Sequence, residues 1–420
     1  MTQFHKSELM RFNYKNYIVS FVILSFSIGF VGCTGLTTAE GWGSPLIHDS
    51  TLIAATMDDQ IIFLNLDDGS AVANHIDIRY SENEMKRAIY GQPVSSPIYY
   101  DGSNELFEEL IFVATYNGWL HAILDFSEND YEIIESEKIT DSQIIGGILT
   151  FDNKIYLGTT DGEDGELYSF QISLKTNDRG NPEVSFEDDW SMKFDGGIWS
   201  TPFFYNNDLI LTTLDGHVHS VDLEGNLNWS KKFDSAISSS PLVINQQVLF
   251  GGFDSTFYSL DFDTGEINWT FDEAENWYWA TPVESNGIIF APSLDGNIYA
   301  LDIDSGRKKW EMQTGDAIVG SPVIINDLIV SGSKDGSIYV AEVKSGEILG
   351  QCNIDEKIES DIIADPDSSG VIYFSARDHS FRALKIKSNG NPDEYWEAPY
   401  FSDKLKDDKL AQPNDWAPNC

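Results

Sequence analysis

Short stretches of alternating apolar and polar residues recur along the chain and are separated by turns rich in glycine and aspartate. One unit reads as four extended segments, at residues 280–283, 287–291, 297–302 and 307–312. Alternation with a period of two, enriched in β-branched and aromatic residues, is typical of strands. Asp-Gly and Ser-Gly pairs are typical of the tight turns that join such strands. The unit is therefore predicted to be a four-stranded antiparallel sheet.

This unit occurs eight times. Proline or isoleucine marks the start of each copy, preceded by a small residue in seven of the eight, and these anchors are Pro45, Pro97, Ile148, Pro202, Pro241, Pro282, Pro322 and Ile362. An aspartate lies 13 residues after the anchor in six copies, at Asp58, Asp161, Asp215, Asp254, Asp295 and Asp335. A four-stranded unit of about 40 residues is the size of a propeller blade, and one such unit alone cannot bury both of its faces. The prediction is an all-β fold, an eight-bladed β-propeller of four-stranded antiparallel blades over residues 42–400.

The closing positions of the units carry tryptophans. Trp229, Trp269 and Trp310, with Trp190 as their equivalent, are expected to dock a large ring between adjacent blades. In the last unit, residues 395–398 are expected to form the outer strand, so that this blade needs no strand from the N-terminus. A polar tail over residues 401–420 follows it.

The N-terminus carries an export signal. Three basic residues precede an uncharged run over residues 17–31, which as a helix would span about 22 Å and is too short for a hydrocarbon core of about 30 Å. This pattern indicates a secretory signal peptide over residues 1–32. Its end, Phe30-Val31-Gly32-Cys33, resembles the bacterial lipobox, which implies lipidation at Cys33 and a linker over residues 33–41. An uncleaved anchor is the alternative, and both place the propeller outside the cytoplasm, on the cell membrane or an outer membrane.

The charge is strongly acidic. Lys and Arg number 26 against 68 Asp and Glu, a formal net charge of −42. Such a surface repels phosphate backbones and anionic headgroups, so nucleic acid is excluded as a partner and membrane attachment requires the N-terminal lipid. Besides Cys33 the chain contains Cys352 and Cys420. They can pair in an oxidising compartment, but their number and spacing leave this open and predict no metal site.

The repeat, with its Ser-Pro, Asp-Gly-x-x-Tyr-Ala-Leu-Asp-x-x-Ser/Thr-Gly and closing Trp, resembles the pyrroloquinoline-quinone (PQQ)-like propeller repeat. Within that family the chain resembles the non-catalytic lipoprotein branch of BamB, a scaffold of outer-membrane protein assembly. The other branch, the quinoprotein dehydrogenases, holds PQQ and Ca²⁺ beside a vicinal disulfide and a catalytic Asp. This chain has no Cys-Cys pair and lacks their long insertions. The resemblance therefore implies no enzyme activity, no catalytic residue and no PQQ.

Calcium and histidine chemistry are also not expected. Turns such as Asp302-Ile-Asp304-Ser-Gly306 place glycine fifth, whereas an EF-hand loop needs it sixth. The seven histidines are scattered, and His217 and His219 occupy ordinary third-strand positions, where a structural role is expected.

Aromatic residues gather just before the anchors. Trp42, Trp199 and Trp279 lie three residues before theirs, and Trp277 and Tyr278 adjoin Trp279. If these segments are innermost, the rings line one mouth of the propeller axis, where exposed aromatics bind peptide segments or sugars. The alternative is that they pack between blades as core. The predicted function is a non-catalytic cell-envelope scaffold that binds an envelope protein complex; a carbohydrate- or small-ligand-binding surface propeller is the alternative, and a PQQ-dependent oxidoreductase the third.

Overall fold

The computed structural model describes residues 43–56, 60–78, 88–99, 106–126, 130–176, 182–366, 370–397, 400, 401 and 420. They all lie in one compact unit, Glu40–Cys420. The expected signal peptide, the lipidation residue Cys33, the linker and Trp42 fall outside the described residues, as does most of the C-terminal tail. No helix within the described ranges has the length and apolar character that a membrane span requires.

The described chain folds into eight sheets, each of four strands that follow one another in sequence and pair antiparallel, and the last sheet has a short fifth strand. Blade 1 contains β1 (Leu46–His48), β2 (Thr51–Ala55), β3 (Gln60–Asn65) and β4 (Ile76–Asp77). Blade 2 contains β5 (Val94–Tyr99), β6 (Leu106–Ala114), β7 (Trp119–Asp125) and β8 (Tyr131–Lys138). Blade 3 contains β9 (Leu149–Phe151), β10 (Lys154–Thr160), β11 (Gly165–Thr176) and β12 (Pro182–Phe194). Blade 4 contains β13 (Phe203–Tyr205), β14 (Asp208–Thr212), β15 (His217–Asp222) and β16 (Leu227–Lys232).

The second half is more regular. Blade 5 contains β17 (Leu242–Ile244), β18 (Gln247–Gly251), β19 (Phe257–Asp261) and β20 (Ile267–Phe271). Blade 6 contains β21 (Val283–Ser285), β22 (Ile288–Pro292), β23 (Asn297–Asp302) and β24 (Lys308–Gln313). Blade 7 contains β25 (Val323–Ile325), β26 (Leu328–Gly332), β27 (Ser337–Glu342) and β28 (Ile348–Asn353). Blade 8 contains β29 (Ile363–Ala364), β30 (Val371–Ser375), β31 (Ser380–Ile386), β32 (Pro392–Glu394) and β33 (Tyr400–Phe401). The predicted eight-bladed propeller is confirmed.

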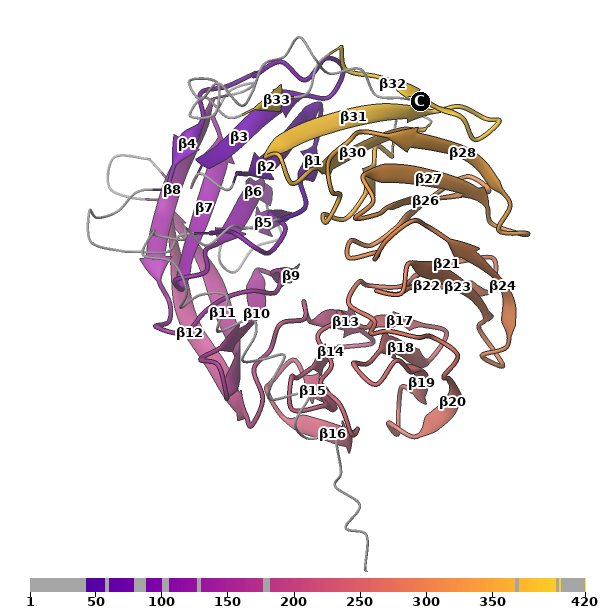
Figure 1. Ribbon diagram of the computed structural model, residues 1–420. Coiled ribbons are helices and arrows are strands. Elements are labelled where there is room, and N and C mark those ends of the chain that lie inside the picture. Colours follow the sequence, from indigo (N-terminus) through magenta and orange to yellow (C-terminus); the bar gives the residue numbers. More distant parts are fainter. Residues whose placement is uncertain are drawn as a thin grey trace, which may run out of the picture. The chain divides into compact units, whose positions relative to one another are not determined.

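Each pair of neighbouring blades shares one apolar core. Along β2, Leu52 and Ala54 contribute to the core shared with blade 8, whereas Ile53 and Ala55 contribute to the core shared with blade 2. This division follows from the period of two, since successive side chains of a strand point to opposite faces. Eight such clusters join the eight blades. The cluster between blades 8 and 1 closes the ring, and Figure 1 shows these two blades side by side.

In five blades, the residue before the anchor donates a hydrogen bond to the next blade. Its amide donates to the side chain of the equivalent residue in the next blade, in the pairs Gly147–Thr201 (2.8 Å), Thr201–Ser240 (2.9 Å), Thr281–Ser321 (3.1 Å), Ser321–Asp361 (2.6 Å) and Asp361–Ser44 (3.2 Å). Seven of the eight residues at this position are Gly, Ser or Thr, which are small enough for the innermost segments to lie close together. The hydrogen bonds give a second reason for Ser and Thr: these amides need acceptors, because buried backbone donors are costly when unpaired.

The four predicted docking tryptophans lie between blades. Each ring packs on a glycine in the next blade, in the pairs Trp190–Gly225, Trp229–Gly265, Trp269–Gly306 and Trp310–Gly346. Each indole Nε1 donates to a carbonyl just before that glycine, at Leu223 (2.9 Å), Phe262 (2.8 Å), Ile303 (2.9 Å) and Val343 (3.1 Å). The ring thus contributes both apolar area and a directed hydrogen bond to the blade interface.

The last blade differs from the expectation. Residues 395–398 were expected to form its outer strand, but β32 and β33 pair with opposite ends of β31 and Trp396 lies between them. Trp396 is 1% exposed, its Nε1 donates to the Leu66 carbonyl at 2.9 Å, and its ring packs on Gly69. It is therefore a fifth docking tryptophan, and it joins blade 8 to blade 1. Among the described residues, the ring closes through side chains, without a shared strand.

A disulfide joins Cys352, buried in β28 of blade 7, to Cys420 at the end of the chain, 68 residues away. The whole of blade 8 lies within the loop that it closes. This answers the pairing that spacing alone left open. The disulfide lies at the interface between blades 7 and 8, which has no docking tryptophan. Gly350 occupies the strand position where other blades have the tryptophan, and it approaches Gly390 of blade 8.

His219 in β15 is a core histidine, as expected. It is 7% exposed and packs on Phe194 at 4.4 Å between ring centroids. Burial, with a smaller effect of His217, lowers the pKa of His219 from 6.5 to about 4. Since the folded-state pKa lies below the unfolded value, the unfolded chain binds the proton more readily, and stability falls as pH drops from 6.5 to 4.

We therefore expect His219→Gln to reduce the pH dependence of stability. Between pH 7 and pH 4 the wild type should lose up to about 3 kcal/mol of unfolding free energy more than the variant. Urea unfolding of both proteins at several pH values measures this difference. The contribution of the carboxylates cancels in the difference, because both proteins share them. Parallel pH profiles would show that His219 is not buried in its neutral form.

Candidate functional site

The candidate site lies where the segment leading into each blade meets the turn between the second and third strands. We call these the lead-in segment and the second turn. A backbone hydrogen bond joins them in five successive blades, in the pairs Leu214–Gly197, Phe253–Ala236, Leu294–Trp277, Lys334–Ala317 and Arg377–Lys357, with N···O distances of 2.8–3.0 Å. The side chains of these two elements therefore share one end of the propeller.

Four aromatic rings from three blades pack together there. Trp199 comes from the lead-in segment of blade 4, Phe253 from the second turn of blade 5, and Trp277 and Trp279 from the lead-in segment of blade 6. Phe253 stacks on Trp277 at 4.5 Å and 7° and lies 5.8 Å from Trp279, which meets Trp199 edge-on at 5.9 Å. All four side chains are only partly buried. We call these four residues the aromatic cluster.

The cluster contains three of the five residues expected at the mouth. Trp199, Trp277 and Trp279 come together, while Trp42 is outside the described residues. Tyr278 is corrected: it is 1% exposed and belongs to the core between blades 5 and 6. The physical reason is the alternation of an extended segment, which turns residue 278 inward when 277 and 279 face outward.

Phe253 was missed by the sequence analysis. The signal was its position directly before the repeat aspartate Asp254, a slot that holds Leu214, Leu294 and Lys334 in other blades. Nothing in the sequence alone shows that this slot adjoins the lead-in segment. The hydrogen bond from the Phe253 amide to the Ala236 carbonyl places it there.

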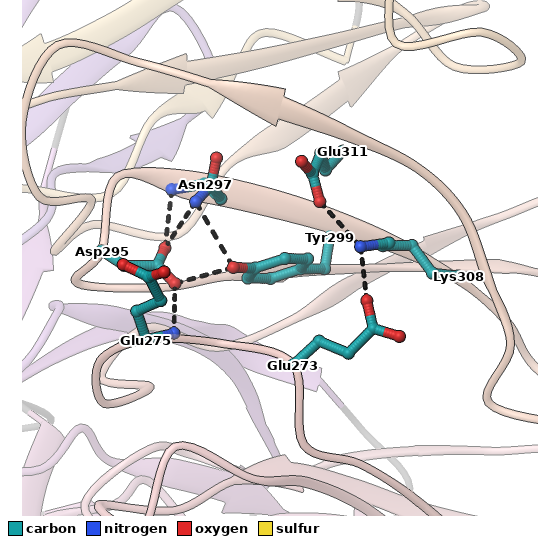
Figure 2. A network of polar contacts seen from close by, with 7 residues as sticks. All are labelled: Glu273, Glu275, Asp295, Asn297, Tyr299, Lys308 and Glu311. Atoms are coloured by element: carbon teal, nitrogen blue, oxygen red, sulfur yellow. Dashed lines mark hydrogen bonds and ion pairs between the residues drawn. The ribbon is translucent and has the colours of Figure 1, made fainter.

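The repeat aspartate of blade 6, Asp295, holds its lead-in segment in place. Figure 2 shows Asp295 accepting hydrogen bonds from the Tyr299 hydroxyl (2.7 Å), the Asn297 amide (2.9 Å) and the amide of Glu275 in the lead-in segment (2.9 Å). Burial, and then the bond to Asp295, raises the pKa of Tyr299. Lys308 bridges Glu273 and Glu311 beside it. Asp295 is therefore structural: it fixes the segment that carries Trp277 and Trp279.

The charged part of this end lies on blades 7 and 8. Glu359 occupies the slot of Trp199 and Trp279, with its side chain 14% exposed. It pairs with Lys334 at 3.2 Å and with Arg377 at 2.7 Å. The aromatic and the charged residues thus occupy different blades around the axis.

The carboxylates considered as cofactor ligands are hydrogen-bonded within the fold. Asp361 is the residue before the last anchor. Its carboxylate already accepts hydrogen bonds from the Ser321 amide and the Ser44 hydroxyl. The calcium-like turns are also occupied from within, since Asp302 accepts from the amide and hydroxyl of Ser305. Across the described ranges, no three His, Cys, Asp or Glu side chains are grouped to hold a metal. No chemical step through such a group follows from these residues.

A comparison with family models matches the one described as outer membrane protein assembly factor BamB, of the PQQ-like repeat, over residues 183–278 and 274–351. No curated protein sequence matches the chain. The matched residues run from the last strand of blade 3 into that of blade 7, where the Asp-Gly and Trp spacing is most regular.

Solved structures show the same fold. BamB from Moraxella catarrhalis is 16% identical, with a TM-score of 0.51 over 74% of this chain and 92% of that one. Chaetomium thermophilum Sqt1 bound to the N-terminus of ribosomal protein L10 is 12% identical, with a TM-score of 0.63 over 84% and 98%. The quinohemoprotein alcohol dehydrogenase ADHIIG from Pseudomonas putida HK5 is 12% identical, with a TM-score of 0.60 over 81% and 70%. Proteins of different chemistry share this architecture, so the site must decide function.

Proposed function

We propose, from the premise that this chain is a β-propeller of the PQQ-like repeat family, that it is a non-catalytic scaffold which binds a protein partner through the aromatic cluster. The observation that carries the proposal is that four large rings from three blades meet at one end and stay partly exposed. A few residues carry most of the binding energy of a protein interface, and tryptophan is enriched among them. A ring cluster held by the blade framework needs little reorganisation to bind.

The proposal includes the cell envelope as the location. The signal peptide over residues 1–32 and lipidation at Cys33 would anchor the propeller outside the cytoplasm. The Cys352–Cys420 disulfide supports export, because such bonds persist mainly in oxidising compartments. The match to the BamB family model supports a role in the assembly of outer-membrane proteins.

The absence of catalysis belongs to the same proposal. Its support is the donor set: the axial carboxylate Asp361 and the turn carboxylates such as Asp302 are already hydrogen-bonded within the fold. A general base or a metal ligand needs a free acceptor within reach of a substrate. The propeller that binds a carbohydrate is the second candidate, since a sugar can also stack on the rings of Trp199 and Trp279.

Crosslinking of the tagged, full-length protein in native membranes tests the proposal. We expect a partner protein crosslinked near the aromatic cluster, and we expect Trp199→Ala combined with Trp279→Ala to lower its capture at least about tenfold. Leu227→Ala is the matched control, because Leu227 is 49% exposed on an outer strand away from the cluster.

Recovery of outer-membrane assembly components would support the BamB-like role. Unchanged capture by the folded double variant would contradict docking at the cluster. If the wild type binds soluble cell-envelope glycans in a titration and the double variant does not, the carbohydrate alternative is supported instead.

A further inference from the structure

Carboxylates surround the aromatic cluster at short sequence distance. Asp254 follows Phe253 directly, and Glu275 lies two residues before Trp277. Asp234 lies two residues before Ala236, whose carbonyl accepts the Phe253 amide at 3.0 Å. The side chains of all three acids are exposed. The cluster therefore carries a negative field on the blade 5 and blade 6 side.

The same elements contain no positive charge. The lead-in segments and second turns of blades 4 to 6, residues 195–202, 213–216, 234–241, 252–255, 272–282 and 293–296, hold no Lys or Arg. In blades 7 and 8 the second turn does contain a cation, Lys334 and Arg377 respectively. Both of these side chains pair with Glu359. Two lysines on outer strands pair with acids of these elements, Lys232 with Asp215 and Lys308 with Glu273. Within the described residues, no Lys or Arg forms an ion pair with Asp234, Asp254 or Glu275, so a bound cation would not compete with one there.

Rings and carboxylates together select a particular ligand class. The faces of aromatic rings attract cations, and tryptophan does so most strongly. Nearby carboxylates add Coulomb attraction and repel an anionic ligand, whereas a neutral sugar would gain nothing from them. The net charge of −42 extends this preference over long range, since it steers basic partners towards the protein.

The indole of Trp199 points to a peptide. Its Nε1 is buried and has no hydrogen-bond partner among the described residues. A buried donor without an acceptor is costly. A turn of the partly exposed Trp199 ring on binding would bring this donor to the carbonyl of an extended main chain, which is an acceptor that a peptide supplies. A polyamine or a metal cation would satisfy the carboxylates but offers no such carbonyl.

We infer that the partner presents an extended peptide segment with an arginine or lysine side chain, and that this cation lies against the aromatic cluster between Asp254 and Glu275. The inference rests on the proposed function, because it names the chemistry of the partner segment at the same site.

A random library of twelve-residue peptides, selected on the purified full-length protein, tests it. We expect binders enriched in Arg or Lys at one position. Replacing that residue with citrulline or norleucine, which remove the charge, should weaken binding about 3- to 30-fold. Glu275→Gln should weaken binding at least about threefold, while Glu347→Gln, the same change at an exposed turn of blade 7, should have no effect.

The outcomes separate the two proposals. Peptides that bind the Trp279→Leu variant more weakly, but bind equally well with citrulline, would support the cluster as the docking site. They would overturn the inference that a cation lies against it. Binders that tolerate both Trp279→Leu and Trp199→Leu would overturn both. A folded protein that selects no peptide would overturn the inference, while crosslinking in membranes would still decide the proposed function.

Discussion

Gly265→Ala is expected to lower the free energy of unfolding by about 3 kcal/mol. Gly265 lies in the third turn of blade 5 with a φ of +69°, and a Cβ placed there would be 2.7 Å from Cε3 of Trp229. The left-handed conformation costs a non-glycine residue about 1–2 kcal/mol. The remainder comes from displacing the indole ring, which strains the packing and the 2.8 Å hydrogen bond from Nε1 to the Phe262 carbonyl.

The control is a second glycine with the same backbone conformation and free space. Gly287 has a φ of +76°, and its nearest neighbour would be Cγ2 of Ile303 at 3.8 Å, which is ordinary van der Waals contact. Gly287→Ala should therefore cost only the backbone penalty, about 1 kcal/mol. Urea unfolding of both variants measures the difference. Equal losses would show that the docked ring contributes nothing to the blade interface.

Most of the fold could be predicted because a propeller repeats one four-stranded unit whose strands pair with their neighbours in sequence. The third strand of blade 6 lies at Asn297–Asp302, as the alternation predicts. The first strand begins only at Val283 instead of Ala280, because Thr281 hydrogen-bonds to Ser321 of the next blade instead of pairing within its sheet. Local patterns predict pairing within a blade, whereas the bonds between blades depend on which residues the ring brings together.

The same limit explains the errors at the site. Trp396 was interpreted as part of a strand because its spacing in the last repeat is irregular, and only ring closure brings Gly69 beneath it. Phe253 and Trp199 are 54 positions apart in sequence, and no periodic pattern joins a second turn to a lead-in segment. For Tyr278 the sequence does contain the signal, because alternation along the short run Trp277-Tyr278-Trp279 turns its middle ring to the opposite face from its neighbours.

Blade 8 has a docking tryptophan on one side only, and this gives the disulfide a large expected effect. Its interface with blade 1 has the docked Trp396, whose Nε1 bonds to Leu66. Its interface with blade 7 has Gly350 in the tryptophan position, so the apolar cluster there has no indole and no directed bond from one. The disulfide joins the end of the chain back to blade 7 at Cys352, next to this interface.

Cys420→Ser is therefore expected to lower the free energy of unfolding of the oxidised protein by about 4 kcal/mol, the loop-closure value for a loop of 68 residues. Cys420 is exposed, so the substitution removes the crosslink and leaves the buried Cys352 side chain in its core. Reduction of the wild type by dithiothreitol should cause the same loss, while Cys352→Ser should cost more because it buries a hydroxyl. Hydrogen exchange locates the effect, and β30 and β31 should lose protection before the strands of blades 4 to 6. If exchange in blade 8 is unchanged and urea unfolding is the same with and without the crosslink, the remaining contacts of blade 8 are sufficient to hold the ring closed.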